Sequence, residues 1–382
     1  MLIEIAKSSL IYAVQNVVKA LSSNPAQPAS AAIRIRADLN GVTLTASGAS
    51  MKIRIVLPRD DTSANVRQAG SIAVSAHHFY RTIRRLEEGT VTLEVREPLM
   101  LTIASSRFRM RLCGIGDAEF DNNGLAKEAF SVRFRIDGTT FGSAIRQVAK
   151  AASLSENRPI LTGLLLECDQ AKLRLTATDG IRLASRSLDI ETLEGGGSQA
   201  IVPAKTLNEI AKMLKQAGKA VEVELSRNRA TFVADRLHIE ANLLSGNFPS
   251  VKSVDSASGL CEFKVDRAEW LQALERVTIV AEDQIVRLAA DRTRLHLSSK
   301  APAIGEVEHE VPLQAMVGGS FVLSLNGKLL TDIVRGSDCA FFRITYTGPM
   351  TPLVIRPDDL SESSLFLITS VRTQESWRRE ER

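Results

Sequence analysis

The feature of this sequence that most constrains its fold is a pattern that occurs three times along 382 residues. In each copy an alternating apolar segment leads directly into an amphipathic helix, in residues 72–86, 201–214 and 321–334. The copies start 129 and 120 residues apart (201 − 72 and 321 − 201). A solenoid unit is much shorter than this spacing, so the pattern predicts a repeated domain.

A second strand-helix unit opens each third of the chain, beginning near Leu2, Val132 and Cys261. Apolar residues recur in every predicted helix at steps of three and four, which marks one buried face. Each third therefore has two helices and a series of short strands. The predicted fold class is α+β, built as three tandem copies of one domain.

Domain boundaries are predicted where short polar stretches rich in turn-forming residues interrupt this pattern, near 122–124 and 255–259. The predicted domains cover residues 1–123, 124–256 and 257–373, and residues 374–382 form a charged tail. A further glycine run, residues 195–197, is expected to be a loop inside the second domain.

Composition limits the class of protein further. The apolar fraction is 44%, enough for a substantial core, and 48 basic against 44 acidic residues give a net charge of +4. No segment is apolar and long enough to span a membrane, so no membrane partner is expected. Four widely spaced cysteines without a Cys-x-x-Cys pair favour a reducing cytoplasm and predict no metal site.

Motifs for enzymatic chemistry are missing from the sequence. We find no phosphate-binding loop, no Gly-x-Ser-x-Gly, no metal-spaced histidine or cysteine cluster and no dinucleotide fingerprint. The segment Thr178-Asp179-Gly180 is predicted to be a turn rather than a catalytic loop. We therefore expect a non-catalytic protein without a cofactor. An enzyme on a repeated scaffold is the alternative from another class, and turnover by the purified protein would distinguish it.

One stretch is more specific than any other. Residues 158–167 are followed by residues 175–184, which contain Ala-Thr-Asp-Gly-x-Arg-Leu-Ala. Ile-Val-Pro-Ala-Lys at 201–205, Gly-Asn-Phe-Pro at 246–249 and Pro-Leu-Val-Ile at 352–355 follow in order. With these segments on a threefold repeat, nearly the whole chain resembles the bacterial DNA polymerase III beta subunit family, the beta sliding clamps.

The resemblance implies a fold and a set of partners. It implies three DNA-clamp domains per chain and a ring-shaped, head-to-tail homodimer that encircles double-stranded DNA without reading its sequence. The expected protein partners are the DNA polymerase III alpha subunit, the clamp loader and other proteins with a clamp-binding motif. The expected location is the cytoplasm, at the nucleoid. The alternative within the family is a specialised paralogue with an altered pocket, serving repair or drug tolerance.

The resemblance also implies a peptide-binding pocket between the second and third domains. The residues carried over to it are Leu161, Thr178, Gly180, Arg182, Leu183, Pro249, Val254, Pro352, Val371 and Arg372. Leucines and valines of this kind are equally expected in a core, whereas Gly180 and Arg182 favour a turn and a surface or partner contact. Ile181 and Thr369-Ser370 depart from the family pattern, so an altered pocket shape is expected.

Cations recur on nearly all of the predicted helices. A cationic helix by itself is usually an ordinary solvated face, but their recurrence favours contact with the phosphates of DNA. The predicted DNA-facing residues are Arg81, Arg84, Arg85, Arg146, Lys150, Lys205, Lys212 and Lys328. Asn24 stands where the family has a DNA-contacting arginine, so the resemblance does not imply that contact in this chain.

The predicted dimer interface joins the first domain of one protomer to the third domain of the next. Its residues are Phe108, Met110, Arg107, Ile279, Val280 and Glu306. An ordinary half-buried strand explains Phe108 and Met110 equally well, but an unpaired apolar edge is an association site. For the tail, residues 374–382, we expect either solvent exposure or docking of Trp377 over the neighbouring pocket.

Overall fold

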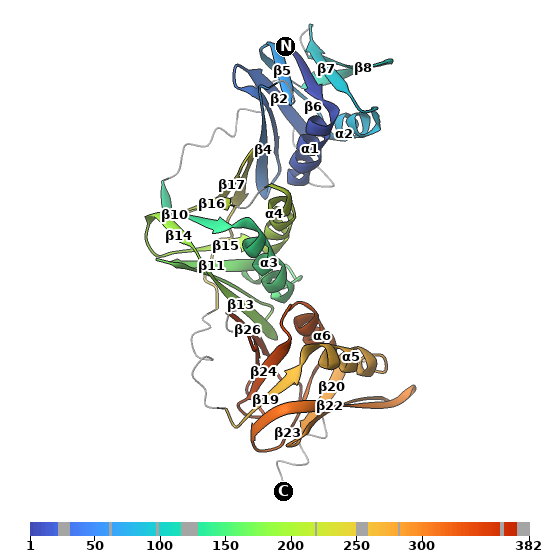
Figure 1. Cartoon of the computed structure of the whole chain (residues 1–382), viewed down its shortest axis with the longest axis vertical. Helices are drawn as coiled ribbons and strands as arrows, with labels where there is room; N and C mark the ends of the chain where they lie inside the picture. Colours follow the sequence, from blue (N-terminus) through green and yellow to red (C-terminus); the bar gives the residue numbers. More distant parts are fainter. Residues whose placement is uncertain are drawn as a thin grey trace. The chain divides into compact units, whose positions relative to one another are not determined.

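The computed structural model in Figure 1 describes residues 1–21, 31–60, 63–96, 99–115, 129–217, 220–249, 259–281, 283–359 and 363–372. The predicted domain boundaries and the tail lie largely outside these residues, as do Asn24, Val254 and Trp377. Two compact units are present. The first comprises Met1–Gly142 and Ile190–Leu243, and the second comprises Ser143–Asp189 and Leu244–Arg382.

The first unit contains three of the six described helices in full. They are α1 (Lys7–Val17), α2 (Ala76–Arg85) and α4 (Ala204–Ala217). Its strands are β1 (Leu2–Ala6), β2 (Ala32–Asp38), β3 (Gly41–Ser47), β4 (Met51–Pro58), β5 (Ala64–Gln68), β6 (Gly70–Ser75), β7 (Thr90–Val95), β8 (Met100–Ser105), β9 (Phe108–Ile115), β10 (Phe130–Asp137), β14 (Glu191–Gly195), β15 (Ser198–Pro203), β16 (Ala220–Ser226), β17 (Arg229–Ala234) and β18 (Leu237–Asn242).

The second unit contains α5 (Arg267–Val277) and α6 (Gly327–Arg335), and α3 (Gly138–Val148) contains the boundary between the units. Short 3-10 turns occupy Val18–Ala20, Ala149–Ala151 and Pro159–Thr162. The strands of this unit are β11 (Gly163–Asp169), β12 (Lys172–Thr178), β13 (Arg182–Asp189), β19 (Cys261–Asp266), β20 (Ile285–Ala290), β21 (Arg294–Ala301), β22 (Gly305–Gly318), β23 (Phe321–Asn326), β24 (Phe341–Tyr346), β25 (Leu353–Pro357) and β26 (Ser364–Ile368).

The predicted threefold repeat is visible in the order of elements. A strand runs directly into a helix six times, in the pairs β1–α1, β6–α2, β10–α3, β15–α4, β19–α5 and β23–α6. Helices α5 and α6 each begin with a side-chain cap. Asp266 accepts a hydrogen bond from the Glu269 amide, and Asn326 accepts one from the Leu329 amide. The α+β prediction and the paired helices of each third are confirmed.

Strand pairing joins neighbouring thirds of the sequence into continuous sheets. In the first unit the order is β14-β10-β16-β17-β18-β4-β3-β2-β6-β9-β8-β7-β1-β5, and β18 pairs with β4 through Leu237 and Ile55. In the second unit β13 pairs with β26 through Leu183 and Leu367. The middle third therefore contributes to both compact units. The glycine run expected to be a loop begins inside a strand, because Gly195 pairs with Val132.

The cores lie beneath the helices and are filled by aliphatic and aromatic side chains. Phe141 and Phe232 stack with centroids 6.1 Å apart in the first unit, and both are buried. Trp270 and Phe342 meet edge to face at 5.7 Å in the second. Burial of such large apolar surfaces is the main force that holds each helix on its sheet.

Candidate functional site

A tight turn between β12 and β13 forms the centre of the predicted pocket. The Asp179 carboxylate accepts hydrogen bonds from the backbone amides of Ile181 and Arg182, both at 2.9 Å, and Thr178 Oγ1 donates to Arg182 O at 2.7 Å. Gly180 has a φ of +93°, a conformation that favours glycine. The prediction that Thr178-Asp179-Gly180 is a turn is confirmed.

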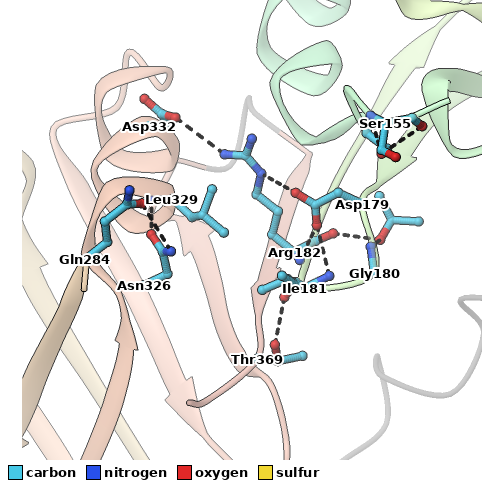
Figure 2. A network of polar contacts seen from close by, with 12 residues as sticks. Ser155, Asp179, Gly180, Ile181, Arg182, Gln284, Asn326, Leu329, Asp332 and Thr369 are labelled. Carbon is cyan, nitrogen blue, oxygen red and sulfur yellow. Dashed lines mark hydrogen bonds and ion pairs between the residues drawn. The ribbon is translucent and has the colours of Figure 1, made fainter. Parts of the chain in front are cut away.

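The Arg182 side chain reaches from this turn to helix α6 (Figure 2). Its Nε lies 3.1 Å from Asp179 Oδ2, and its Nη1 lies 3.6 Å from Asp332 Oδ2. The side chain is only 11% exposed. The sequence favoured a surface or partner role for Arg182, but two carboxylates already neutralise its charge inside the protein. Its position is therefore fixed by internal ion pairs.

The last described residues pack against the same turn. The backbone amide and hydroxyl of Thr369 both donate to Ile181 O, at 2.9 and 3.0 Å. Ser370 Oγ donates to Pro349 O at 2.8 Å. The Thr369 contacts tie the residues after β26 to the β12–β13 turn, although they are far apart in the sequence (Figure 2), and the Ser370 contact ties them to the loop between β24 and β25.

A buried polar layer lies behind Arg182, and sequence reasoning did not find it. Gln147 on α3 accepts hydrogen bonds from Arg186 Nη1 at 3.0 Å and Ser364 Oγ at 3.2 Å, and its amide donates to Ser337 Oγ at 3.4 Å. Buried polar groups require such partners. The one available signal was a glutamine on the apolar face of a helix, which does not identify its partners.

The predicted pocket residues divide into core and rim. Leu161, Thr178 and Leu183 are buried. Leu183 packs with Val354 and Leu367, so a core role explains it. The residues with solvent access are Gly180, Pro249, Pro352, Val371 and Arg372. Two apolar side chains outside the predicted set are exposed on the same unit, Ile181 at 50% and Met350 at 60%.

All eight predicted DNA-facing cations are exposed. Some have partners: Lys212 Nζ lies 2.6 Å from Glu209, and Arg81 Nη1 lies 3.3 Å from His77 Nε2. Lys150 Nζ lies 2.9 Å from the position that a Cβ would take at Gly336, where α6 ends. A cation is favourable at the C-terminus of a helix. Lys150 therefore lies beside the C-terminal end of α6.

Among the described strands, the strand that carries the first half of the predicted interface is paired on one side only over most of its length. Over Phe108–Cys113, β9 pairs with β8 on one side, and it meets β6 only at Gly114 and Ile115. Beside it, α2 and β9 border a groove of about 880 Å³, lined in part by Arg81, Thr82, Phe108 and Met110. Phe108 is 43% exposed, which is unusual for a large aromatic side chain.

The second half lies in the third repeat. The half of β22 from Gly305 to Pro312 pairs with β21 on one side, and no other described strand pairs with it. Glu306, Glu308 and Glu310 alternate along it and are exposed. Ile279 follows the end of α5 and is 79% exposed, whereas Val280 is half-buried.

Three tandem repeats of a domain with two helices on antiparallel strands place this chain in the fold class of the DNA clamps. Sequence profiles of the DNA polymerase III beta subunit match residues 1–130 (N-terminal domain), 135–250 (central domain) and 261–368 (C-terminal domain). The chain belongs to the DNA polymerase III beta subunit family and functions as a sliding clamp.

Within the described residues, none of the helices has both the length and the apolar character needed to cross a bilayer.

Individual relatives agree with this assignment over nearly the full length. The beta sliding clamp of Bacillus subtilis strain 168 is 30% identical, covering 97% of this chain and 99% of that protein. A Staphylococcus aureus beta sliding clamp is 26% identical, covering 97% and 98%. The crystal structure of the Bacillus subtilis DNA polymerase sliding clamp superposes with a TM-score of 0.92 at 30% identity, covering 98% and 99%.

Proposed function

We propose that two copies of this chain close head to tail into a ring around double-stranded DNA, with β9 of one copy beside β22 of the other. The observation that carries this proposal is the complementarity of two unpaired edges. Arg107, just before β9, and Arg109 and Arg111 on β9 are exposed, and glutamates alternate along the half of β22 that only β21 pairs with among the described strands. Opposite charges facing each other across paired strands stabilise the pairing. A head-to-tail contact between two copies closes when the rotation between them permits.

A mixing experiment tests this pairing. A protein with Arg107→Glu and Arg109→Glu and a second protein with Glu306→Lys and Glu308→Lys should each be monomeric, because like charges meet at both joints. Mixed in equal amounts, they should form a dimer in light scattering, since opposite charges are restored at both joints. Mixed proteins that stay monomeric would refute the pairing of these edges.

Ile279 provides an independent test of the apolar part of the joint. We propose that Ile279 and Val280 of one copy enter the groove beside Phe108 and Met110 of the other. Ile279→Asp would bury an unpaired charge, which costs about 3–5 kcal/mol, and the protein should become a folded monomer. The matched control is Leu39→Asp, because Leu39 is 83% exposed and lies between β2 and β3. A dimeric Ile279→Asp protein would exclude this groove.

We further propose that the solvent-accessible rim around Gly180, Pro249, Pro352, Val371 and Arg372 binds clamp-binding peptides of the DNA polymerase III alpha subunit, the clamp loader and other clients. Support comes from exposed apolar side chains beside a turn fixed by hydrogen bonds, a combination suited to peptide anchoring. Ile181→Asp should weaken binding of a fluorescent clamp-binding peptide roughly tenfold, whereas Leu193→Asp on β14 should leave it unchanged. Equal affinities would exclude this rim.

The domains are those predicted from the sequence, 1–123, 124–256 and 257–373. The exposed helix cations contact phosphates in the hole of the ring. The protein acts in the cytoplasm, at the nucleoid, and holds DNA by topology rather than by base recognition.

A further inference from the structure

The strand β23 has an edge that is only partly covered. It is the last strand of its sheet and pairs with β20 on one side, from Phe321 to Asn326. On the other side the described residues contribute one backbone hydrogen bond, from the Val371 amide to Ser324 O at 2.7 Å. The edge from Phe321 to Leu323 is therefore available to the chain that follows Arg372.

The internal repeat gives the direction of that chain. In the first third, β6 occupies the place of β23, because each strand leads into the second helix of its third. The end of β9 covers the same edge of β6 in antiparallel register, with Gly114 opposite Val74 and Ile115 opposite Ala73. Val371 opposite Ser324 corresponds to Ile115 opposite Ala73. An antiparallel continuation carries the residues after Val371 back along β23 towards Phe321.

An exposed apolar patch lies on β22, the strand that leads into β23, and on the residue before β19. Val317 on β22 is 75% exposed, and Leu260, which precedes β19, is 61% exposed. Val317 pairs with Glu262 and Gly318 with Cys261, so Leu260 and Val317 lie diagonally on one face of the sheet. Two neighbouring apolar side chains with this much exposure are suited to contact with another apolar side chain.

The sequence after Arg372 fits both features. An antiparallel continuation would put residue 374 opposite Phe321 and Trp377 three residues further along, a reach of about 10 Å. Trp377 is the one aromatic residue in the segment 373–382, Thr-Gln-Glu-Ser-Trp-Arg-Arg-Glu-Glu-Arg. An indole ring is large enough to cover two aliphatic side chains.

We propose that residues 373–377 add to the free edge of β23 as an antiparallel strand and that Trp377 packs on Leu260 and Val317. This placement differs from docking over the peptide pocket, the possibility raised by the sequence. It directs the tail along the sheet edge, and it holds Val371 and Arg372 in place on the rim. The proposal is independent of ring closure and of DNA binding.

Tryptophan fluorescence tests the position of Trp377. The chain has two tryptophans, and the other, Trp270, is fully buried, so Trp270→Phe leaves Trp377 as the sole reporter. Acrylamide should quench Trp377 less in the full chain than in a free peptide of residues 373–382. Val317→Asp should raise quenching to the level of the peptide, and Leu193→Asp should not. Quenching equal to that of the free peptide, or shielding that Val317→Asp leaves unchanged, would overturn the proposal.

Hydrogen exchange provides a second test that keeps the natural tryptophans. Backbone amides alternate along a strand, so the Val322 amide points to the same side as the Ser324 carbonyl that binds Val371. The Val322 amide should exchange more slowly in the full chain than in a chain that ends at Arg372. The Leu288 amide on β20 serves as the control, and its rate should not change. Identical Val322 rates in the two chains would also reject the added strand.

Discussion

Arg182 Nη1 on β13 and Asp332 Oδ2 on α6 lie 3.6 Å apart, although 150 positions (332 − 182) separate them in the sequence. The contact joins the turn at the peptide rim to a helix of the third repeat (Figure 2). Because Arg182 is only 11% exposed and Asp332 is 36% exposed, the pair lies at the edge of the interior. There, water screens charges less than it does at an open surface.

Removal of the Asp332 carboxylate should destabilise the protein moderately. Asp332→Ala leaves Arg182 with Asp179 as its remaining carboxylate, so we expect a loss of about 1 kcal/mol in the free energy of unfolding, together with weaker peptide binding. Urea unfolding and fluorescence polarisation measure the two effects. Asp338→Ala is the matched control, because Asp338 is exposed in the loop after α6. Unchanged stability and affinity would mean that the pair has no role.

Neutralising helix cations should weaken DNA binding without regard to sequence. A protein with Arg84→Ala, Lys205→Ala and Lys328→Ala should lose about 3 units of the slope of log affinity against log salt concentration, since each cation neutralises one phosphate. Binding of a labelled duplex across a salt series gives the slope. The control changes three exposed strand cations, Arg36, Lys172 and Arg174, to alanine. If the control variant loses more of the salt slope than the helix variant, DNA contacts the strand surface instead of the helices.

Acidification should destabilise the first unit through His238. Burial, and then the nearby Arg54 guanidinium, lower the pKa of His238 below its ordinary value. The unfolded chain therefore binds a proton near the ordinary pKa of about 6.5, while the folded protein still does not. The contribution of neutral His238 to stability is complete above the pKa that His238 has in the unfolded chain. It is lost as the pH falls towards the lower pKa that His238 has in the folded protein.

Urea unfolding at about pH 7.5 and about pH 5.5, either side of the ordinary histidine pKa, measures this effect. We expect the drop in stability to be smaller in His238→Gln, which has no titrating ring. Arg54→Gln should also reduce it, because removing the cation raises the pKa of His238. If the unchanged protein, His238→Gln and Arg54→Gln all lose the same stability between the two pH values, the loss comes from other titrating groups.

Trp270 should tolerate phenylalanine but not alanine. Its indole is fully buried against Phe342, and its Nε1 has no hydrogen-bond partner among the described residues. Trp270→Phe removes a polar group that is costly to bury and leaves a small cavity, so the two effects offset within about 1 kcal/mol. Trp270→Ala should cost about 3–5 kcal/mol. Thermal unfolding compares them, and equal losses would show that ring packing contributes little.

The outline of the fold follows from local sequence patterns. Apolar spacing predicted the strand-helix repeat, because burying one face of each helix and strand requires that spacing. The turn at Gly180 was also predictable, since an Asp-Gly pair has a strong local preference for turns. The motif Ala-Thr-Asp-Gly-x-Arg-Leu-Ala placed Arg182 near the pocket, but its charge alone suggested solvent or a partner.

The sequence by itself determined the repeated α+β domain, the cationic helices and the family, because these depend on residues close together in the chain. Only the tertiary structure decided which carboxylates surround Arg182, which groups satisfy Gln147, and that strands of the middle repeat join those of both neighbours. It alone showed that, among the described strands, β9, β22 and β23 each have an edge that is at least partly unpaired. Strand partners and buried ion pairs arise between residues far apart in sequence, so no local pattern encodes them.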